Sequence, residues 1–227
     1  KLKREGYIIA RCTVARLMKK LGIQGVWRGK NKQTTRSRDE QKRADDLVKR
    51  NFNADHPDQL WVSDFTYIQT HSGWVYTAFI IDVFSRAIVG WKVSTRMNTD
   101  MVLDALEQAL HDRGMPKNVI HHSDRGVQYL SIRYTNRLEA ANLRASVGTT
   151  GDSYDNALAE TVNGLYKTEV IEYLKADWQG LADVQLATLN WVDWFNKERV
   201  HSALGYVSPF EFEAMYYDKI NPLGQVA

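Results

Sequence analysis

Three acidic residues occupy positions where a solvated carboxylate is not expected. Asp64 lies inside the alternating apolar stretch 60–68, Asp124 follows an apolar pair at 119–120, and Glu160 lies in a segment of helical period. Strand interiors disfavour Asp, so Asp64 needs a buried hydrogen bond or a metal ion. Three gathered carboxylates repel one another, and a divalent cation with oxygen ligands relieves that repulsion. The residue types therefore predict a site for Mg²⁺ or Mn²⁺.

The elements that must bring these acids together are predicted from hydrophobic periodicity. Apolar alternation or short apolar runs predict strands at 60–68, 74–82, 87–94, 119–122 and 144–147. Three- and four-residue spacing predicts helices at 13–22, 99–111, 131–141, 153–173 and 181–197, and a short helix from Ser208. We read Thr13 and either Thr99 or Asp100 as N-caps of their helices. The order is mixed α/β, and it puts two acids on strands and the third on a covering helix.

Glu160 shares one face of its predicted helix with three other polar residues, Asn156, Asn163 and Lys167. The four lie at i, i+4, i+7 and i+11, a spacing that aligns side chains on a helix. We expect Lys167 to hold a DNA phosphate beside the acids, and the two asparagines to contact substrate or to orient Glu160. A solvated helix face is the alternative for the same residues.

A histidine pair, His121 and His122, stands just before Asp124. The pair would bind metal or act as a base, but a structural or supporting role for His122 is favoured. At a strand end, one ring is expected to point into the sheet and the other outward. Gln128, four residues after Asp124, is expected to line the same loop and support the site.

The net charge of +3 hides a marked asymmetry. Residues 1–50 carry 16 Lys and Arg against 5 Asp and Glu, a balance of +11, which leaves 14 against 22, or −8, for the other 177 residues. A basic segment of this kind indicates a polyanionic partner. Within it, Arg28, Lys30 and Lys32 are candidate DNA contacts, and the amphipathic helix at 13–22 is compatible with the last helix of a helix-turn-helix unit.

Composition excludes several other classes of protein. Cys12 is the single cysteine, which rules out an intrachain disulfide and cysteine-based zinc sites. No stretch approaches the roughly 20 apolar residues of a membrane span, and the first residues lack the apolar segment of a signal peptide. We therefore expect a protein of the cytoplasm without a membrane partner.

The motifs around the three acids resemble those of a known family. Asp64 and Asp124 are separated by 59 residues, and Asp124 and Glu160 by 35. In this the chain resembles DDE recombinases of the retroviral integrase superfamily, in which the second acid and the final Glu are commonly 35 residues apart. More closely, the chain resembles the second-frame product of IS3-family bacterial insertion sequences. The motifs carrying this likeness are WVSDFTY at 61–67, HSDRGVQY at 122–129, GDSYDNALAE at 151–160, Asn163, Lys167, and NKERVHSALG at 196–205 with Ser208 and Pro209.

The resemblance implies a fold and an organisation. The fold is an RNase H-like mixed five-stranded sheet flanked by helices, preceded by a small basic helical N-terminal segment. We expect this segment and a linker at 1–50, with a helix-turn-helix remnant, then the integrase catalytic core at 51–214 and a C-terminal tail at 215–227. Relatives are usually fused to an upstream helix-turn-helix and leucine-zipper region.

The resemblance also implies an activity, namely cleavage of a phosphodiester at the ends of the insertion sequence and transfer of the new 3′-hydroxyl to another strand. Asp64, Asp124 and Glu160 would be both catalytic residues and ligands of two Mg²⁺ or Mn²⁺ ions. The partners would be element ends and target DNA, bound by a homodimer or larger assembly on the bacterial nucleoid. Two alternatives remain open: a metal-dependent nuclease that does not join strands, and an inactive DNA-binding protein derived from a transposase.

Overall fold

The computed structural model describes residues 1–25, 46–48, 51–124, 126–148, 157–174 and 177–221. Its strands are β1 (Leu60–Thr70), β2 (Gly73–Asp82), β3 (Ile88–Ser94), β4 (Ile120–Ser123) and β5 (Arg144–Val147). Its α-helices are α1 (Arg11–Lys20), α2 (Thr99–Asp112), α3 (Ile132–Ala140), α4 (Ala157–Tyr166), α5 (Leu181–Lys197) and α6 (Pro209–Ile220). The predicted mixed α/β fold is confirmed, and the described ends of the predicted elements fall within two residues of those observed.

The five strands form one mixed sheet in the order β3-β2-β1-β4-β5. The hairpins β1–β2 and β2–β3 are antiparallel, whereas β4 pairs parallel with both β1 and β5. The hairpin of β1 and β2 is long, with paired residues from Trp61 opposite Asp82 to Thr70 opposite Gly73. The parallel pairing is short, since only Leu60–Ser63 of β1 lie beside β4. Among the described residues, the β4 side of β1 is therefore open from Asp64 onward.

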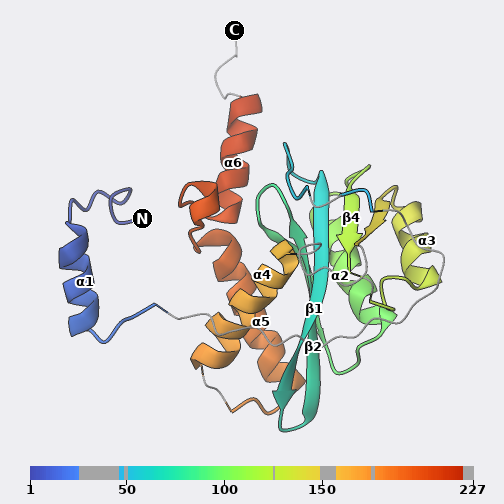
Figure 1. Ribbon diagram of the computed structural model, residues 1–227, viewed down its shortest axis with the longest axis horizontal. Coiled ribbons are helices and arrows are strands. Elements are labelled where there is room, and N and C mark those ends of the chain that lie inside the picture. The colour runs from blue at the N-terminus through green and yellow to red at the C-terminus, as the bar shows by residue number, and fades with distance from the viewer. Residues whose placement is uncertain (26–45, 49–50, 125, 149–156, 175–176, 222–227) are drawn as a thin grey trace.

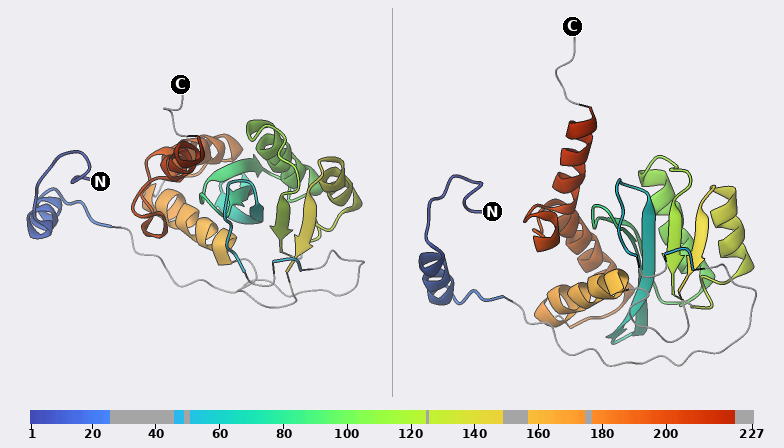
Figure 2. Two further views of the ribbon diagram at one scale, coloured as in Figure 1. Left: turned by 90° about the horizontal axis from the view of Figure 1, so that it is seen from above. Right: turned by 45° about the horizontal axis from the view of Figure 1, so that its top comes forward.

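Helices cover both faces of the sheet (Figures 1 and 2). The alternation of β1 divides its side chains between two apolar cores. Val62 and Ile68 face a core shared with α4 and α5, where Tyr166 and Phe195 are fully buried. Trp61 faces the other core, which is shared with α2 and α3. Asp64 is in phase with Val62, so the strand directs it toward α4.

Helix α4 does not end in an ordinary α-helical turn. It continues as a π-helical segment, Lys167–Glu172, which starts at the lysine predicted to contact DNA. Such wide turns are rare and are frequent at functional sites. The predicted helix at 153–173 is thus continuous where the structure describes it, but it changes from α-helical to π-helical winding at Lys167. Its predicted start lies outside the described residues.

Two of the predicted helix caps are wrong. Helix α1 begins at Arg11 with Ala10 as N-cap and no side-chain cap, so Thr13 lies inside its first turn. Helix α2 is capped by Asn98, whose side-chain oxygen accepts the Met101 N–H at 3.2 Å, rather than by Thr99 or Asp100. Asn is as good a cap as Asp, and its position one residue earlier leaves Thr99 free to take helical backbone angles.

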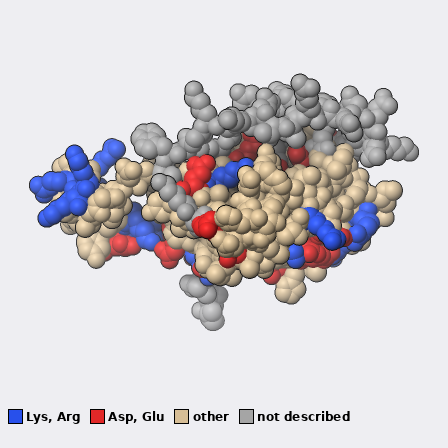
Figure 3. Space-filling view, turned by 90° about the horizontal axis from the view of Figure 1, so that it is seen from below, with Lys and Arg blue, Asp and Glu red and all other residues tan. Residues whose placement is uncertain are grey.

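Residues 1–25 contribute no residue to either core, whereas Val48, near the end of the predicted linker, is buried in the core shared with α4 and α5. Helix α1 has no buried residue, and it stands away from the sheet in Figures 1 and 2. Figure 3 shows Lys and Arg side chains gathered on this segment. Ion pairs join it to the rest of the chain: Lys1 with Glu198 at 2.7 Å, and Arg4 with Glu211.

The C-terminal helix α6 begins as predicted, with Ser208 as its N-cap and Pro209 in its first turn. It runs to Ile220 and so continues past residue 214, where we placed the start of a tail. None of the described helices has both the length and the apolar character needed to cross a membrane.

Gly90 of β3 provides a test of how closely the sheet packs on α2. A Cβ at this position would lie 2.3 Å from the Ala105 carbonyl oxygen and 2.9 Å from the Ala109 Cβ. Because the neighbour is helix backbone, it cannot rotate away. We expect Gly90→Ala to lower the free energy of unfolding by about 1–3 kcal/mol, the usual cost of overpacking, measured by urea denaturation.

The matched control is Gly25→Ala, because nothing lies within 4 Å of a Cβ added there. We expect the unfolding midpoint of this variant to equal that of the unchanged protein. Equal stability of the two variants would contradict the close approach of β3 and α2.

Candidate active site

Asp64 is the central residue of the candidate site. One carboxylate oxygen accepts the Phe65 N–H at 2.8 Å, and the other accepts an N–H from the Asn163 amide at 2.9 Å. The residue keeps some exposed surface, but its carboxylate is desolvated, and burial is the main reason that the pKa of Asp64 is raised far above its usual range. The charges of Asp124 and then Glu160 raise the pKa further. The three predicted acids therefore act on one another electrostatically.

Asp124 lies one residue beyond the end of β4, beside the open edge of β1. Its side chain accepts the Gly126 N–H at 2.9 Å. Burial raises the pKa of Asp124, while this hydrogen bond and the nearby His122 oppose the rise. A Cβ on Gly126 would lie 3.0 Å from the Asp124 carboxylate and 3.1 Å from the Gln128 side-chain oxygen, so the loop packs tightly around this acid.

Glu160 occupies the first turn of α4 and is partly buried. It lies three residues before Asn163, whose side chain contacts Asp64, so it shares the sheet-facing side of the helix, and its charge raises the pKa of Asp64. Even so, no group of three or more His, Cys, Asp or Glu among the described residues is arranged closely enough to hold a metal ion. The acids thus share an electrostatic environment without converging on one point, and the predicted metal site stays a prediction.

Asn163 and Lys167 extend from the same helix in different directions. Asn163 is buried and donates to Asp64, while its own side-chain oxygen is buried without a hydrogen-bond partner among the described residues. Lys167 places its ammonium nitrogen 4.7 Å from the centre of the Tyr67 ring. The observed hydrogen bond of Asn163 is thus to Asp64. The role toward Glu160 that we expected for the asparagines stays a prediction.

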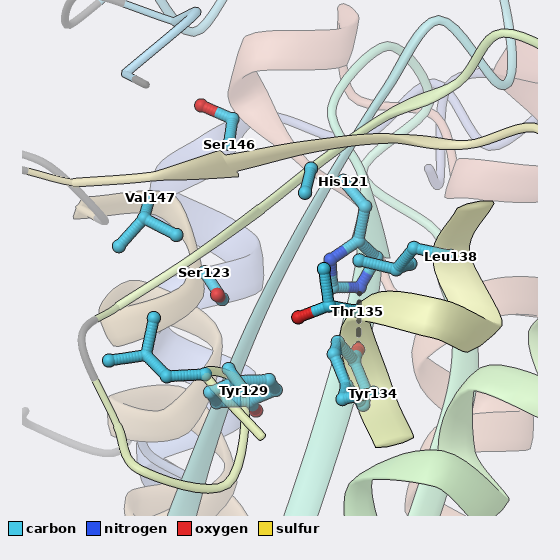
Figure 4. Close-up of a pocket in the computed structure, with 10 residues that line it drawn as sticks. His121, Ser123, Tyr129, Tyr134, Thr135, Leu138, Ser146 and Val147 are labelled. Atoms are coloured by element: carbon cyan, nitrogen blue, oxygen red, sulfur yellow. Dashed lines mark hydrogen bonds between the residues drawn. The ribbon is translucent and has the colours of Figure 1, made fainter. Parts of the chain in front are cut away.

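Both histidines before Asp124 are buried, each about 1% exposed, so the expectation that one points outward is wrong. The reason is that helices or loops cover both faces of β4. The His122 Nδ1 lies 2.9 Å from the Ser146 hydroxyl, and its ring packs edge-on against Phe52. The His121 Nε2 lies 3.1 Å from the Tyr134 hydroxyl on α3 (Figure 4).

Burial, followed by the effect of His122, lowers the pKa of His121 to about 3, so this ring is neutral. It borders a small cavity of about 60 Å³ whose lining includes Tyr129 and Tyr134. Figure 4 shows the rings of Tyr129 and Tyr134 beside this cavity. The environment suits a structural role for His121 better than that of a base.

Gln128 is buried in the loop after Asp124, near Gly126, where the sequence placed it. The remaining predicted contacts, Asn156, Arg28, Lys30 and Lys32, lie outside the described residues. Arg199, in the motif at 196–205, forms an ion pair with Glu169 at 2.6 Å.

The aromatic partner of Lys167 is a residue that sequence reasoning missed. Tyr67 ends the motif at 61–67, but nothing in the sequence indicates that a helix residue one hundred positions later covers it. Its place three residues after Asp64 puts it on the opposite face of the strand, so no sequence pattern signals this contact.

Family comparisons match most of the chain. A family described as integrase core domain matches residues 54–153, and a second integrase core domain family matches residues 141–209. An HTH-like domain family matches residues 1–31.

Several transposases are similar in sequence. The transposase of insertion sequence element IS629 from Shigella sonnei is 57% identical over 219 residues, which are 96% of this chain and 73% of that protein. The putative transposase of IS986/IS6110 from Mycobacterium tuberculosis is 52% identical over 221 residues, covering 95% of this chain and 79% of that one. Transposase InsF of IS3A from Escherichia coli K12 is 38% identical over 172 residues, covering 75% and 59%.

Solved structures with the same fold are retroviral integrases. The HTLV-2 integrase catalytic core domain, in a structure described as a complex with magnesium, has a TM-score of 0.57 at 18% identity and covers 71% of this chain and 99% of that one. A chain of the simian T-cell lymphotropic virus intasome has a TM-score of 0.60 at 17% identity, and the match covers 70% of this chain and 55% of that one. Because these identities are low, they establish the RNase H-like fold alone.

The matches to the IS629 and IS986/IS6110 transposases are stronger evidence, since each combines more than 50% sequence identity with at least 95% coverage of this chain. Because it is 57% identical to one insertion-sequence transposase across 73% of that protein and folds as an integrase core, the chain belongs to the IS3 family of insertion-sequence transposases.

Proposed function

We propose that this transposase cleaves a phosphodiester at the ends of its insertion sequence and joins the resulting 3′-hydroxyl to target DNA, with Asp64, Asp124 and Glu160 as the catalytic acids. The observation that carries the proposal is the environment of Asp64, a desolvated carboxylate whose pKa is raised by burial and by the two other acids. Carboxylates held together against their repulsion in this way are typical of functional sites.

The three acids suit two Mg²⁺ or Mn²⁺ ions by the chemistry of their donors, because hard divalent cations prefer carboxylate oxygens. Asp64, Asp124 and Glu160 would hold these ions. When bound, such ions stabilise the attacking and leaving oxygens of a phosphodiester. The magnesium named for the HTLV-2 integrase core is consistent with this choice.

The chain's own residues would hold the acids in place. Asn163 donates to one oxygen of Asp64, which fixes the carboxylate plane, and the Gly126 N–H restrains Asp124. Lys167 extends from the same helix and would bind a DNA phosphate. Asn156, Arg28, Lys30 and Lys32 would add contacts to DNA, and His122 and Gln128 would support the loop that bears Asp124.

The partners in this proposal are the element ends and target DNA. Joining two ends requires a homodimer or a larger DNA-bound assembly, and an upstream helix-turn-helix and leucine-zipper region would read the end sequence. The HTH-like match at residues 1–31 supports a DNA-binding role for the N-terminal segment. The reaction would take place on the nucleoid, in the bacterial cytoplasm.

The second candidate is a nuclease that hydrolyses DNA without joining it. Labelled element ends incubated with the protein, target DNA and Mg²⁺ distinguish the two activities. We expect products in which labelled ends are covalently joined to target strands. Hydrolysed ends with no joined product would support the nuclease instead.

Replacing Asp64 tests the acids independently of folding. We expect Asp64→Asn to abolish cleavage and joining, because a neutral amide cannot substitute for the carboxylate, while binding of end DNA without metal is retained. In EDTA, the variant should unfold at a higher temperature than the unchanged protein, since a desolvated and repelled charge is removed. A carboxylate whose pKa is raised by folding destabilises the folded protein increasingly as pH rises. The difference in unfolding temperature between the two proteins should therefore be larger at pH 8 than at pH 5.

The same pair of proteins tests the metal. Mg²⁺ at about 100 times its dissociation constant should stabilise the unchanged protein by about 2.7 kcal/mol per site and the Asp64→Asn variant by much less. Asp193→Asn, at an exposed acid on α5, is the control and should respond to Mg²⁺ like the unchanged protein. An identical response of all three proteins would contradict a metal site at Asp64.

The basic N-terminal segment generates a separate prediction. Deleting residues 1–45, which leaves Val48 in the core, should weaken binding of end DNA and flatten the dependence of log affinity on log salt, by about 0.9 for each phosphate that the segment neutralises. Fluorescence anisotropy across a salt series measures this slope. An unchanged slope would show that the segment binds no phosphate.

A further inference from the structure

Two aromatic rings lie together on an exposed part of the sheet, next to the open edge of β1. Tyr67 of β1 and Trp74 of β2 pack edge to face, with ring centres 5.3 Å apart and planes at 84°. Trp74 is paired with Gln69, so it is a diagonal neighbour of Tyr67 on the same face. Tyr67 is 38% exposed and Trp74 is 50% exposed, so the pair offers aromatic surface to solvent.

A positive charge accompanies this pair. The Lys167 ammonium lies 4.7 Å from the centre of the Tyr67 ring, a distance at which a cation is attracted to an aromatic face. Lys167 comes from the helix that carries Glu160 and Asn163. The aromatic pair is therefore linked to the helix of the candidate active site.

The position of the pair relative to the acids follows from strand geometry. Tyr67 is three residues after Asp64, about 10 Å farther along β1, and its side chain leaves the strand on the opposite face. Lys167, from the helix that covers the Asp64 face, reaches the Tyr67 ring at the open edge of β1. Strand β4 ends beside Ser63, so among the described residues no neighbouring strand separates the acids from Tyr67 along this edge. A nucleic-acid strand that leaves the acids along this open edge would pass Lys167 and then meet the rings on the other face.

We propose that Tyr67 and Trp74 form a stacking platform for the bases of DNA strands held at the acidic site, with Lys167 neutralising an adjacent phosphate. The inference rests on the proposed function, and it adds a contact to bases that the acids and the basic segment do not provide. Exposed aromatic rings beside a cation are the combination that binds single-stranded nucleic acid without reading its sequence. The platform would accept any base, because every base has a π face.

Two single-stranded probes of equal length separate stacking from phosphate binding. One is an oligothymidylate and the other is a fully abasic oligomer with the same number of phosphates. Binding is measured by anisotropy in EDTA, so that no cleavage occurs. We expect the unchanged protein to bind the oligothymidylate more tightly, by about 5- to 150-fold for each base stacked.

Substitutions of the two rings test whether the preference for the oligothymidylate over the abasic oligomer comes from the platform. Tyr67→Ala and Trp74→Ala should each reduce the ratio of the two affinities, and Tyr67→Phe should retain it because the ring remains. Trp194→Ala, at a tryptophan of α5 that is 44% exposed, is the matched control and should keep the full ratio. Thermal unfolding of each variant checks that the fold is intact.

The outcomes are distinct from those that test the catalytic proposal. Equal affinity for the two probes, or an unchanged ratio in both alanine variants, would overturn the platform even if the unchanged protein cleaves and joins element ends in Mg²⁺. Conversely, a protein that prefers the oligothymidylate through Tyr67 and Trp74 but shows no cleavage would retain the platform and lose the proposed activity.

Discussion

The burial of one carboxylate in the middle of a strand is the constraint on which the arrangement of the site depends. Asp64 would be costly among apolar neighbours without partners, and the structure supplies two hydrogen bonds, one from its own strand and one from Asn163. The second bond requires α4 to cross the sheet at this point. That crossing also places Glu160 near Asp64. One helix therefore supplies both a hydrogen-bond donor to Asp64, from Asn163, and a like charge that repels it, from Glu160.

Charge is distributed differently in the N-terminal segment and the core. Residues 1–25 carry seven Lys or Arg and one Glu, yet two of these cations, Lys1 and Arg4, already pair with acids near α5 and α6. Exposed ion pairs of this kind are weak because water screens them, so a polyanion can displace them. Several cations of the core are held in ion pairs, as Arg199 is by Glu169, whereas Lys167 lies over an aromatic ring.

Sequence patterns were sufficient for the order of elements and for nominating three acids that act on one another electrostatically, and insufficient for the contacts between distant side chains. Alternation around Asp64 and the helical spacing from Glu160 to Lys167 are local patterns, and the elements they predict are present. The burial of both histidines depends on what covers each face of β4, which involves Ser146 and Tyr134 from other elements. The bond from Asn163 to Asp64 and the contact of Lys167 with Tyr67 likewise join residues about one hundred positions apart, and no local pattern encodes them.

The short parallel pairing of β1 with β4 has a consequence for how the protein is made. A ribosome completes the β1, β2 and β3 hairpins, whose pairings are local, well before β4 has been synthesised, and α4 follows later still. Contacts between distant segments form slowly because a long loop must close first. The three acids therefore cannot come together until translation has passed Glu160. The candidate active site of a growing chain thus stays incomplete while the chain is already exposed to cellular DNA.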